Sequence, residues 1–365
     1  MTLVLIVIFV ALVFEYINGF HDTANSIAMG VSTRALTPRL ALTIAACMNL
    51  CGALVGTAVA KTISSGLVAD DAIPKQVMSY LVISALVGAI VWNLITWWFG
   101  LPSSSSHALV GGVVGSALAA SHGNFASVVW FKAGAHHWWE AGGVIGKVIL
   151  PMMLSPVIGF FLGMIVMSLF FLLVRSWRPA AVDRTFRFGQ LFSGAYMGFS
   201  HGSNDAQKTM GIIGLTLVAA TGAHTLDSLP HWASFLRIES LGPNKDHIPI
   251  WIKCTCALVM AAGTAAGGWR IIKTMGQKMV KVLPINGFAA DASGATVLMV
   301  AAHFGMPVST THAITASIMG VGCAKRWSAL KLSVVGRILI AWVLTLPMAA
   351  VFGWLVMRLL IFLGY

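Results

Sequence analysis

Apolar runs long enough to cross a bilayer recur along this chain from its first residues to its last, with only short polar interruptions. A membrane-spanning helix needs about 20 predominantly apolar residues. Hydrophobic residues make up 58% of the sequence and charged residues 9%, whereas soluble domains carry about a quarter charged residues. The sequence therefore predicts an all-α, polytopic membrane protein with about 10–12 transmembrane helices, embedded in a lipid bilayer and without a large soluble domain.

The basic residues are spread over short loops and give a formal net charge of +12. Nucleic-acid binding is not expected, because no basic stripe with stacking aromatic residues is present. Loops rich in Lys and Arg are typical of the cytoplasmic side of a membrane protein. The loops expected on that side lie at residues 34–39, 175–187 and 270–281, which places the N-terminus outside. The sequence does not assign a side to the basic residues at 325–337.

Two motif pairs recur in the same order in the two halves of the chain. Residues 19–25 and 202–208 each contain an aspartate, and residues 102–108 and 307–313 each contain a proline, hydroxyl residues and a histidine. The loop charges send the two aspartate segments in opposite directions across the membrane. The sequence therefore predicts inverted repeats, which place a substrate site at the interface between the halves in many transporters.

The predicted N-terminal repeat covers residues 1–174, with a broken, re-entrant helical hairpin near residues 101–121. The predicted C-terminal repeat covers residues 175–365, with a second hairpin near 305–323. Within the second repeat, residues 219–248 form a reduced hydrophilic loop of mixed charge, which we expect on the outer side. The division assigns one aspartate motif and one hairpin to each half.

Two aspartates lie in otherwise apolar surroundings, Asp22 beside Asn25 and Asp205 beside Asn204. A carboxylate inside the bilayer is costly unless it is paired, hydrated or coordinating a cation. The pattern favours a cation or proton site with oxygen ligands. The alternative interpretation is a neutral aspartate that is hydrogen-bonded between helices.

Each aspartate motif also contains a glycine, Gly19 in the first copy and Gly202 in the second. Glycine is tolerated where a backbone leaves regular structure. We expect both helices to unwind there and to offer backbone carbonyls, an arrangement tolerated at membrane depth only where it lines a cavity.

The proline and hydroxyl motifs are expected to break an apolar span and to begin a new helix. A helix N-terminus presents free N–H groups and the positive end of a dipole, which suit a tetrahedral oxyanion. The residues expected to bind such an anion are Ser103, Ser104, Ser105, Ser106, Gln207, Lys208, Ser309, Thr310 and Thr311. In the alternative interpretation the hydroxyls only cap the helices or bind carbonyls. His107 and His312 follow the hydroxyls, and a supporting hydrogen-bonding role is favoured for them.

These motifs together resemble the PiT family of inorganic phosphate transporters over nearly the whole chain. The resemblance is carried by residues 18–25, 101–106, 200–205 and 306–312. It implies inverted repeats with broken hairpins, and symport of inorganic phosphate, with arsenate as an analogue, by a multi-pass protein of the bacterial inner (plasma) membrane. Asp22 and Asp205 would then correspond to the family's essential aspartates.

The second aspartate motif departs from the family at the position that bears on the coupling ion. Sodium-coupled members keep an Asp followed three positions later by Asn, as Asp22 and Asn25 do, but the second copy has Asp205 and Lys208. An ammonium group there would repel sodium, and the pattern resembles the bacterial low-affinity, proton-coupled branch. We expect proton symport without a cofactor or firmly held metal, of phosphate or a divalent metal–phosphate complex. Sodium is the alternative coupling ion, and Asp291 is expected in the coupling site.

Two other classes of function are considered. A membrane enzyme that acts on a phosphorylated lipid would use the histidines and aspartates as acid–base groups, but no separate nucleophile and base are found. A passive anion channel is compatible with the duplication alone. The Gly- and Ala-rich run at residues 261–268 favours helix packing within one protomer, with a homodimer as the alternative.

Overall fold

The computed structural model describes residues 1–57, 59–60, 73–133, 142–227, 229–239 and 248–364. Its α-helices are α1 (Thr2–Ser32), α2 (Pro38–Leu54), α4 (Lys75–Phe99), α5 (Ser105–Ala120), α6 (Leu150–Leu173), α7 (Pro179–Gly222), α8 (Ile250–Ala266), α9 (Trp269–Lys273), α10 (Pro284–His303), α11 (Thr310–Cys323) and α12 (Leu332–Phe362). Short 3-10 or π segments are η1 (Phe125–Ser127), η3 (Ile145–Ile149), η4 (His231–Leu236), η5 (Thr274–Lys278) and η6 (Trp327–Ala329). The all-α prediction is confirmed.

Five helical segments in the described part of the chain are long and apolar enough to cross a membrane. They are α1, most of α4, the continuous helix formed by η3 and α6, α10 and α12. Helix α8 and the segment of α9 and η5 form a broken pair bent by 58°, which makes a sixth candidate span. The apolar helices α2 and α5 are too short to qualify alone. The fold is therefore polytopic, although fewer spans pass by length and composition than the sequence predicts.

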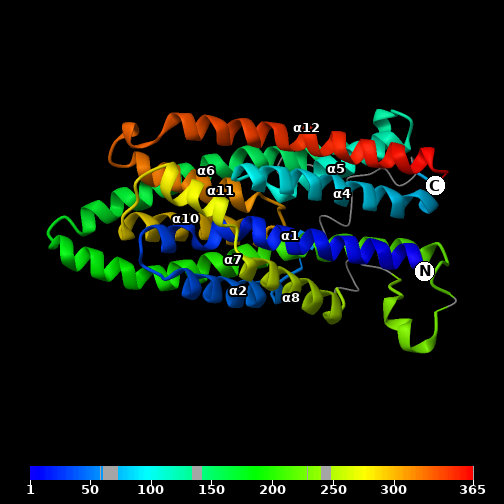
Figure 1. Cartoon of the computed structure of the whole chain (residues 1–365), viewed down its shortest axis with the longest axis horizontal. Helices are drawn as coiled ribbons and strands as arrows, with labels where there is room; N and C mark the ends of the chain where they lie inside the picture. Colours follow the sequence, from blue (N-terminus) through cyan, green and yellow to red (C-terminus); the bar gives the residue numbers. More distant parts are fainter. Residues whose placement is uncertain (58, 61–72, 134–141, 228, 240–247, 365) are drawn as a thin grey trace.

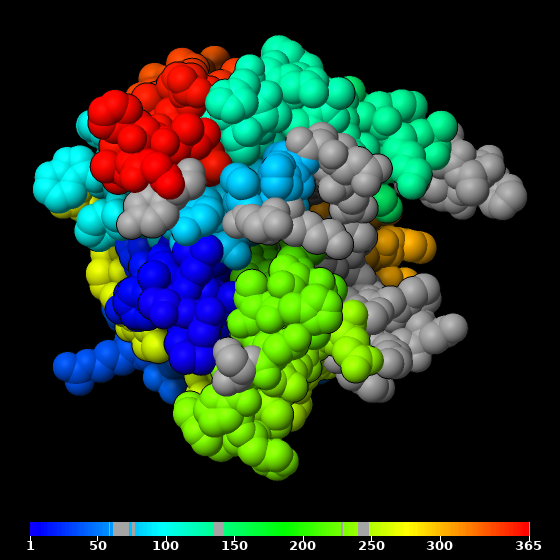
Figure 2. Space-filling model, turned by 90° about the vertical axis from the view of Figure 1, so that its right-hand side faces the viewer, coloured from blue at the N-terminus to red at the C-terminus, as the bar shows by residue number. Residues whose placement is uncertain are grey.

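The helices with equivalent motifs run in opposite directions. Figure 1 shows α1 running away from the end that holds both termini, whereas α7 runs toward it. The hairpin of α4 and α5 turns back to the terminal end, and the hairpin of α10 and α11 turns back to the opposite end (Figure 1). Figure 2 views the terminal end, where the start of α1, the end of α12 and the segment around η4 lie.

The loops with the predicted cytoplasmic charges lie together at the end away from the termini. The connections from α1 to α2, from α6 to α7 and from α11 to α12 are all at this end of the molecule (Figure 1). The basic residues at 325–337, which the sequence alone does not assign, join them because α11 doubles back. Of the predicted hydrophilic loop at 219–248, α7 includes its start up to Gly222, and residues 228 and 240–247 lie outside the described residues.

The helices before and after position 174 are interleaved. Helix α1 packs extensively on α8, and α7 packs on α2. In the same manner α5 packs on α12, and α11 packs on α6. Each aspartate helix and each hairpin arm is therefore covered by a helix from the other half of the sequence.

Close backbone packing explains the glycines of the aspartate motifs. Helices α1 and α7 continue through Gly19 and Gly202, so the expected unwinding is wrong. A β-carbon at Gly19 would lie 2.5 Å from a carbonyl oxygen of α8, and one at Gly202 would lie 2.3 Å from a carbonyl oxygen of α2. The facing glycines Gly263 and Gly52 are equally confined, at 2.2 and 2.1 Å. Small residues let membrane helices approach closely, and Gly263 places the run at 261–268 in packing within one chain.

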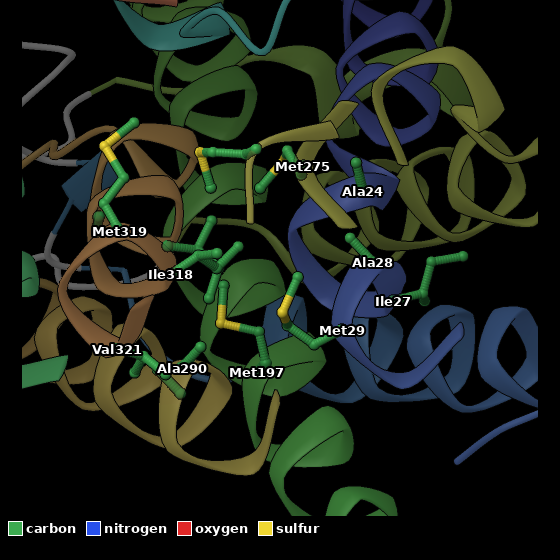
Figure 3. Packing of buried hydrophobic residues seen from close by; sticks show 14 of the residues in the cluster. Ala24, Ile27, Ala28, Met29, Met197, Met275, Ala290, Ile318, Met319 and Val321 are labelled. Carbon is green, nitrogen blue, oxygen red and sulfur yellow. The ribbon is translucent and has the colours of Figure 1, made fainter. Parts of the chain in front are cut away.

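Apolar side chains fill the space between these helices. Figure 3 shows one cluster of buried apolar side chains, in which Met29 of α1 lies next to Met197 of α7; Ala28 of α1, Ala290 of α10 and Met319 of α11 belong to the same cluster. Large apolar side chains on the outer faces of α6 and α12 are exposed instead. Exposed apolar faces of this extent are typical of surfaces that contact lipid.

Candidate functional site

The first turns of α5 and α11 meet α1 and α7 in the interior of the molecule. Ser104 is the N-cap of α5, and its Oγ accepts a hydrogen bond of 3.2 Å from the amide of His107. Ser309 caps α11 in the same way, with a bond of 3.1 Å from the amide of His312. Both serines therefore act as helix caps. The hydroxyl residues that follow each cap remain available to the site.

Asp22 receives hydroxyl donors from both hairpins. Ser105 Oγ donates to Asp22 Oδ2 at 3.2 Å, and Thr311 Oγ1 donates to Asp22 Oδ1 at 3.2 Å. The Nδ1 atom of His21 lies 2.7 Å from Oδ1. Asp22 thus connects the two helix N-termini, which lie more than 200 positions apart in the sequence.

Asp205 has a corresponding environment on α7. Thr310 Oγ1 donates to its Oδ2 at 3.0 Å, and His201 Nε2 lies 3.2 Å from the same oxygen. Its other oxygen forms an ion pair with the ammonium group of Lys208, and both side chains are buried. The carboxylate therefore has a cation beside it in this structure.

Lys208 occupies the position that Asn25 has in the first copy, and the two side chains bind different partners. The Lys208 ammonium donates to Asp205 Oδ1, to Ser106 Oγ and, at 3.4 Å, to the carbonyl oxygen of Val308. Carboxylate, hydroxyl and carbonyl oxygens are also the ligands of hard metal cations. The ammonium thus fills a set of oxygen ligands that would otherwise suit a metal ion.

Asn25 joins the hairpin from the other side. Its Nδ2 lies 3.3 Å from Thr310 Oγ1 and 3.0 Å from Thr311 Oγ1, to which it donates. Its Oδ1 has no hydrogen-bond partner among the described residues. The first copy therefore keeps an unpaired oxygen where the second copy has an ammonium group.

The two aspartates share a compact cluster with a histidine that sequence reasoning did not select. One ligand atom each of Asp22, His201 and Asp205 lies within 4.8 Å of the other two, and all three residues are buried. His201 Nδ1 also lies 3.0 Å from Asn49 Oδ1 on α2. The signal for His201 was present, since it precedes Asp205 by one helical turn on the same face.

Two of the predicted site residues on α7 have other surroundings. Gln207 Oε1 accepts hydrogen bonds from the amides of Val59, at 2.8 Å, and Ala60, at 3.3 Å. Its Nε2 donates to the carbonyl of Ser203 at 2.6 Å. Gln207 thus holds a backbone segment that follows α2. The amide of Asn204 is buried and has no hydrogen-bond partner among the described residues.

Asp291 and Ser103 are bound to groups outside the aspartate cluster. Asp291 on α10 is buried, and Ser193 Oγ on α7 donates to its Oδ2 at 3.4 Å. Ser103 Oγ donates to Thr96 Oγ1 at 2.8 Å, and Thr96 Oγ1 lies 3.1 Å from His21 Nε2. Ser103 is therefore connected to Asp22 through His21, which its Oγ also approaches directly at 3.5 Å.

His107 and His312 meet each other at the start of the two hairpin arms. Their ring centroids are 4.8 Å apart, and His312 stacks on Trp342 of α12 at 3.9 Å. Trp342 Nε1 donates to the carbonyl of Pro102 at 3.0 Å. Neither imidazole has a hydrogen-bond partner among the described residues. The side chains of these histidines therefore make ring contacts, and these contacts connect both hairpins to α12.

Glu15 is a second residue that sequence reasoning did not select. It is buried on α1, and Thr209 Oγ1 on α7 donates to its Oε2. Its signal was direct, because it is the one acidic residue in the first apolar run. An ionisable residue inside a membrane helix is expected to have a functional role.

Comparison with known proteins decides the family. A sequence profile described as "Phosphate transporter family" matches residues 18–353. The chain belongs to this phosphate transporter family. The PiT resemblance inferred from the motifs is therefore confirmed. Because the family consists of transporters, the protein is not an enzyme, and the phosphorylated-lipid enzyme considered above is excluded.

Bacterial relatives of the phosphate transporter family match nearly the full length of the chain. Proteins of Bacillus subtilis (strain 168) and Rhizobium meliloti (strain 1021) are 41% and 42% identical, covering 96% and 93% of this chain and 95% and 91% of their own. A Mycobacterium bovis relative is 40% identical over 99% of this chain and 78% of its own. Each is named "Probable low-affinity inorganic phosphate transporter".

A solved structure has the same fold. The protein in that structure is named "The sodium-dependent phosphate transporter", and it superimposes with a TM-score of 0.79, covering 99% of this chain and all of the other, at 24% sequence identity. The two chains therefore share their fold over nearly their whole length.

Proposed function

We propose that this protein imports inorganic phosphate across the bacterial plasma membrane by symport with protons. Family membership and the names of its relatives support phosphate as the substrate. The observation that favours the proton as the coupling ion is the buried ion pair between Lys208 and Asp205. A fixed ammonium in direct contact with the second aspartate opposes a sodium ion there, because like charges at short range disfavour each other.

The hydroxyls of the hairpins supply a physical link between cation and anion binding. Ser105 and Thr311 donate to Asp22, and Thr310 donates to Asp205. Protonation of an aspartate weakens its hold on these donors, because charge-assisted hydrogen bonds are the stronger ones. The released hydroxyls, together with the helix N-termini of α5 and α11, then favour a tetrahedral oxyanion. Proton binding thereby promotes phosphate binding.

A divalent metal–phosphate complex is an additional cargo that the site suits. Asp22, Asp205 and His201 offer two carboxylates and an imidazole within 4.8 Å of one another. Carboxylate and imidazole donors suit several divalent cations. Arsenate shares the tetrahedral oxyanion geometry of phosphate, so it is expected to compete for the same donors.

The site residues are buried in this structure, so transport requires alternation with other conformations. Asp22, Asp205, Lys208 and the hairpin hydroxyls are all buried. Because the sequence halves are interleaved, the moving units differ from the halves 1–174 and 175–365. We infer that the end with the basic loops faces the cytoplasm, which leaves the N-terminus outside, as the loop charges predict.

Uptake of radiolabelled phosphate into proteoliposomes tests the proposal. A pH gradient or a sodium gradient is imposed separately, each with and without magnesium. We expect the pH gradient alone to drive accumulation above the external concentration, and an ionophore that collapses the gradient to abolish it. Accumulation driven only by sodium would contradict proton coupling and favour the sodium alternative, to which the name of the solved relative points. Phosphate flux that never exceeds equilibrium would indicate a passive channel.

A further inference from the structure

Glu15 is an acidic side chain that the mechanism above does not use. It is fully buried on α1. Thr209 Oγ1, on the neighbouring helix α7, donates to its Oε2, and its Oε1 has no hydrogen-bond partner among the described residues. The side chain of Asn18 on α1 is a further polar group that acts on the carboxyl. A buried carboxyl with an unsatisfied oxygen is costly. Its presence therefore calls for a role beyond packing.

The two copies of the aspartate motif differ by two charges of opposite sign. Counted from the aspartate of each copy, Glu15 takes the position that Gly198 has in the second copy. Lys208 takes the position that Asn25 has in the first copy. Each copy thus contributes one charge that the other copy lacks, and both side chains are buried.

Ionisable groups on two neighbouring helices act on Glu15, beside the polar side chains of Thr209 and Asn18. Asp205 and Lys208 of α7 act on it electrostatically. The thiol of Cys256 on α8 is the third titratable group beside it. Helix α4, which also packs on α1, has no ionisable side chain between residues 81 and 99. Any change in the charge of Glu15 therefore acts mainly on the Asp205–Lys208 pair.

We propose that Glu15 binds a further coupling proton, in addition to the proton that the aspartates bind, and so contributes to the coupling of proton movement to phosphate transport. This inference rests on the proposed proton symport and names a further residue that takes part in it. The Glu15 carboxylate accepts a proton from hydronium on the side from which phosphate enters, so that an O–H bond of hydronium breaks and the O–H bond of a neutral carboxylic acid forms. On the opposite side this O–H bond breaks and the proton returns to water, which forms hydronium again.

The charges of the site explain why this proton accompanies phosphate. With Asp22, Asp205 and Glu15 ionised, Lys208 is opposed by three buried carboxylates. An entering phosphate anion adds further negative charge to a region of low dielectric, where repulsion is strong. Protonation of Glu15 removes one of these charges from beside Lys208. The ammonium is then shared between Asp205 and the phosphate.

The test compares driven uptake with exchange in the full-length protein. Glu15→Gln keeps the size and hydrogen-bonding capacity of the side chain and cannot carry the proton. In proteoliposomes, accumulation of radiolabelled phosphate under a pH gradient should fall about tenfold, within the usual range of coupling energies. Exchange of internal for external phosphate at equal pH should continue, and its dependence on pH should flatten. Glu15→Asp should restore driven accumulation.

A matched pair at Thr209 probes the same interaction. Thr209→Ser keeps the hydroxyl that donates to Glu15 and should keep the pH dependence of exchange. Thr209→Val removes the hydroxyl donor while keeping the shape of the side chain. The pH at which phosphate exchange is half-maximal should then differ from that of the unaltered protein. Equal pH profiles for these two variants would count against the proposed role.

The remaining outcomes separate this inference from the proposed function. If the unaltered protein accumulates phosphate only with sodium, the proposed proton symport fails and the inference falls with it. If the unaltered protein and Glu15→Gln are driven equally by pH, the inference alone is overturned. Loss of exchange together with accumulation in both Glu15→Gln and Glu15→Asp indicates a structural role and also overturns it.

Discussion

Lys208 and Asp205 form an ion pair across one turn of α7, with both side chains buried. Removing one partner of a buried pair leaves an uncompensated charge and destabilises a protein by about 3–5 kcal/mol. The pair also anchors the start of α5, because the Lys208 ammonium donates to Ser106. The lysine therefore has a structural effect and a functional effect that experiments can separate.

Replacement of Lys208 should change the coupling ion. Lys208→Asn restores the Asp and Asn spacing of the first copy, so we expect pH-driven uptake to fall and stimulation by a sodium gradient to appear. Lys208→Met leaves Asp205 without a cation and should lower the free energy of unfolding by about 3 kcal/mol. Proteoliposome uptake and thermal unfolding in detergent measure the two effects. Lys331→Asn, at an exposed lysine, is the control. If a sodium gradient stimulates uptake equally in Lys208→Asn and Lys331→Asn, Lys208 does not determine the coupling ion.

Neutralising either aspartate should strongly reduce phosphate uptake, but the two variant proteins should differ in thermal stability. Asp22→Asn and Asp205→Asn should each reduce phosphate uptake about a hundredfold, at the upper end of typical coupling energies. Asp205→Asn also leaves Lys208 unpaired and should lower the melting temperature, whereas Asp22 has no lysine partner among the described residues. Asp183→Asn is the matched control, because that aspartate is 45% exposed and pairs with Arg187. Normal uptake by Asp22→Asn would exclude the proposed link between cation and anion binding.

Gly263 should not tolerate a side chain, because a β-carbon there would lie 2.2 Å from a carbonyl oxygen of α1. Gly263→Ala should force α1 and α8 apart and destabilise the protein by about 1–3 kcal/mol. Gly336→Ala is the control, since no described atom lies within 4 Å of the added carbon, and alanine is the better helix former by about 1 kcal/mol. Thermal unfolding of the purified variants measures both. An unchanged melting temperature for Gly263→Ala would show that the helices separate readily.

Trp342 should control the position of the first hairpin. Trp342→Phe keeps a ring for His312 to stack on but removes the hydrogen bond to the carbonyl of Pro102. Leaving that buried carbonyl unsatisfied should cost about 1–3 kcal/mol, and displacement of the hairpin should raise the KM for phosphate. Trp354→Phe, at a tryptophan that is 41% exposed, serves as the comparison. A KM raised equally in both variants would assign the effect to general destabilisation.

The main features of the fold and part of the site are predictable from local sequence patterns. The proline and hydroxyl motifs mark where α5 and α11 begin, and Ser104 and Ser309 cap those helices as their residue type predicts. The recurrence of the motifs is enough to group Asp22 with Asp205 from the sequence alone. Repetition is informative because each match constrains the interpretation of the other.

Features that depend on which helix faces which are not predictable in this way. Gly19 suggests a flexible backbone, but α8 lies against it and makes it a packing residue. Gln207 lies next to Lys208 in the sequence, yet its amide binds backbone that follows α2. The partners of His201 and Glu15 likewise come from pairings between helices distant in the sequence. A local pattern carries no information on such long-range pairing.

The interleaving of helices also limits how the chain can be divided. A polypeptide that stopped after α6 would expose the faces of α1 and α5 that α8 and α12 cover. Neither half could assemble the cluster alone, because Asp22 requires Thr311 and Lys208 requires Ser106.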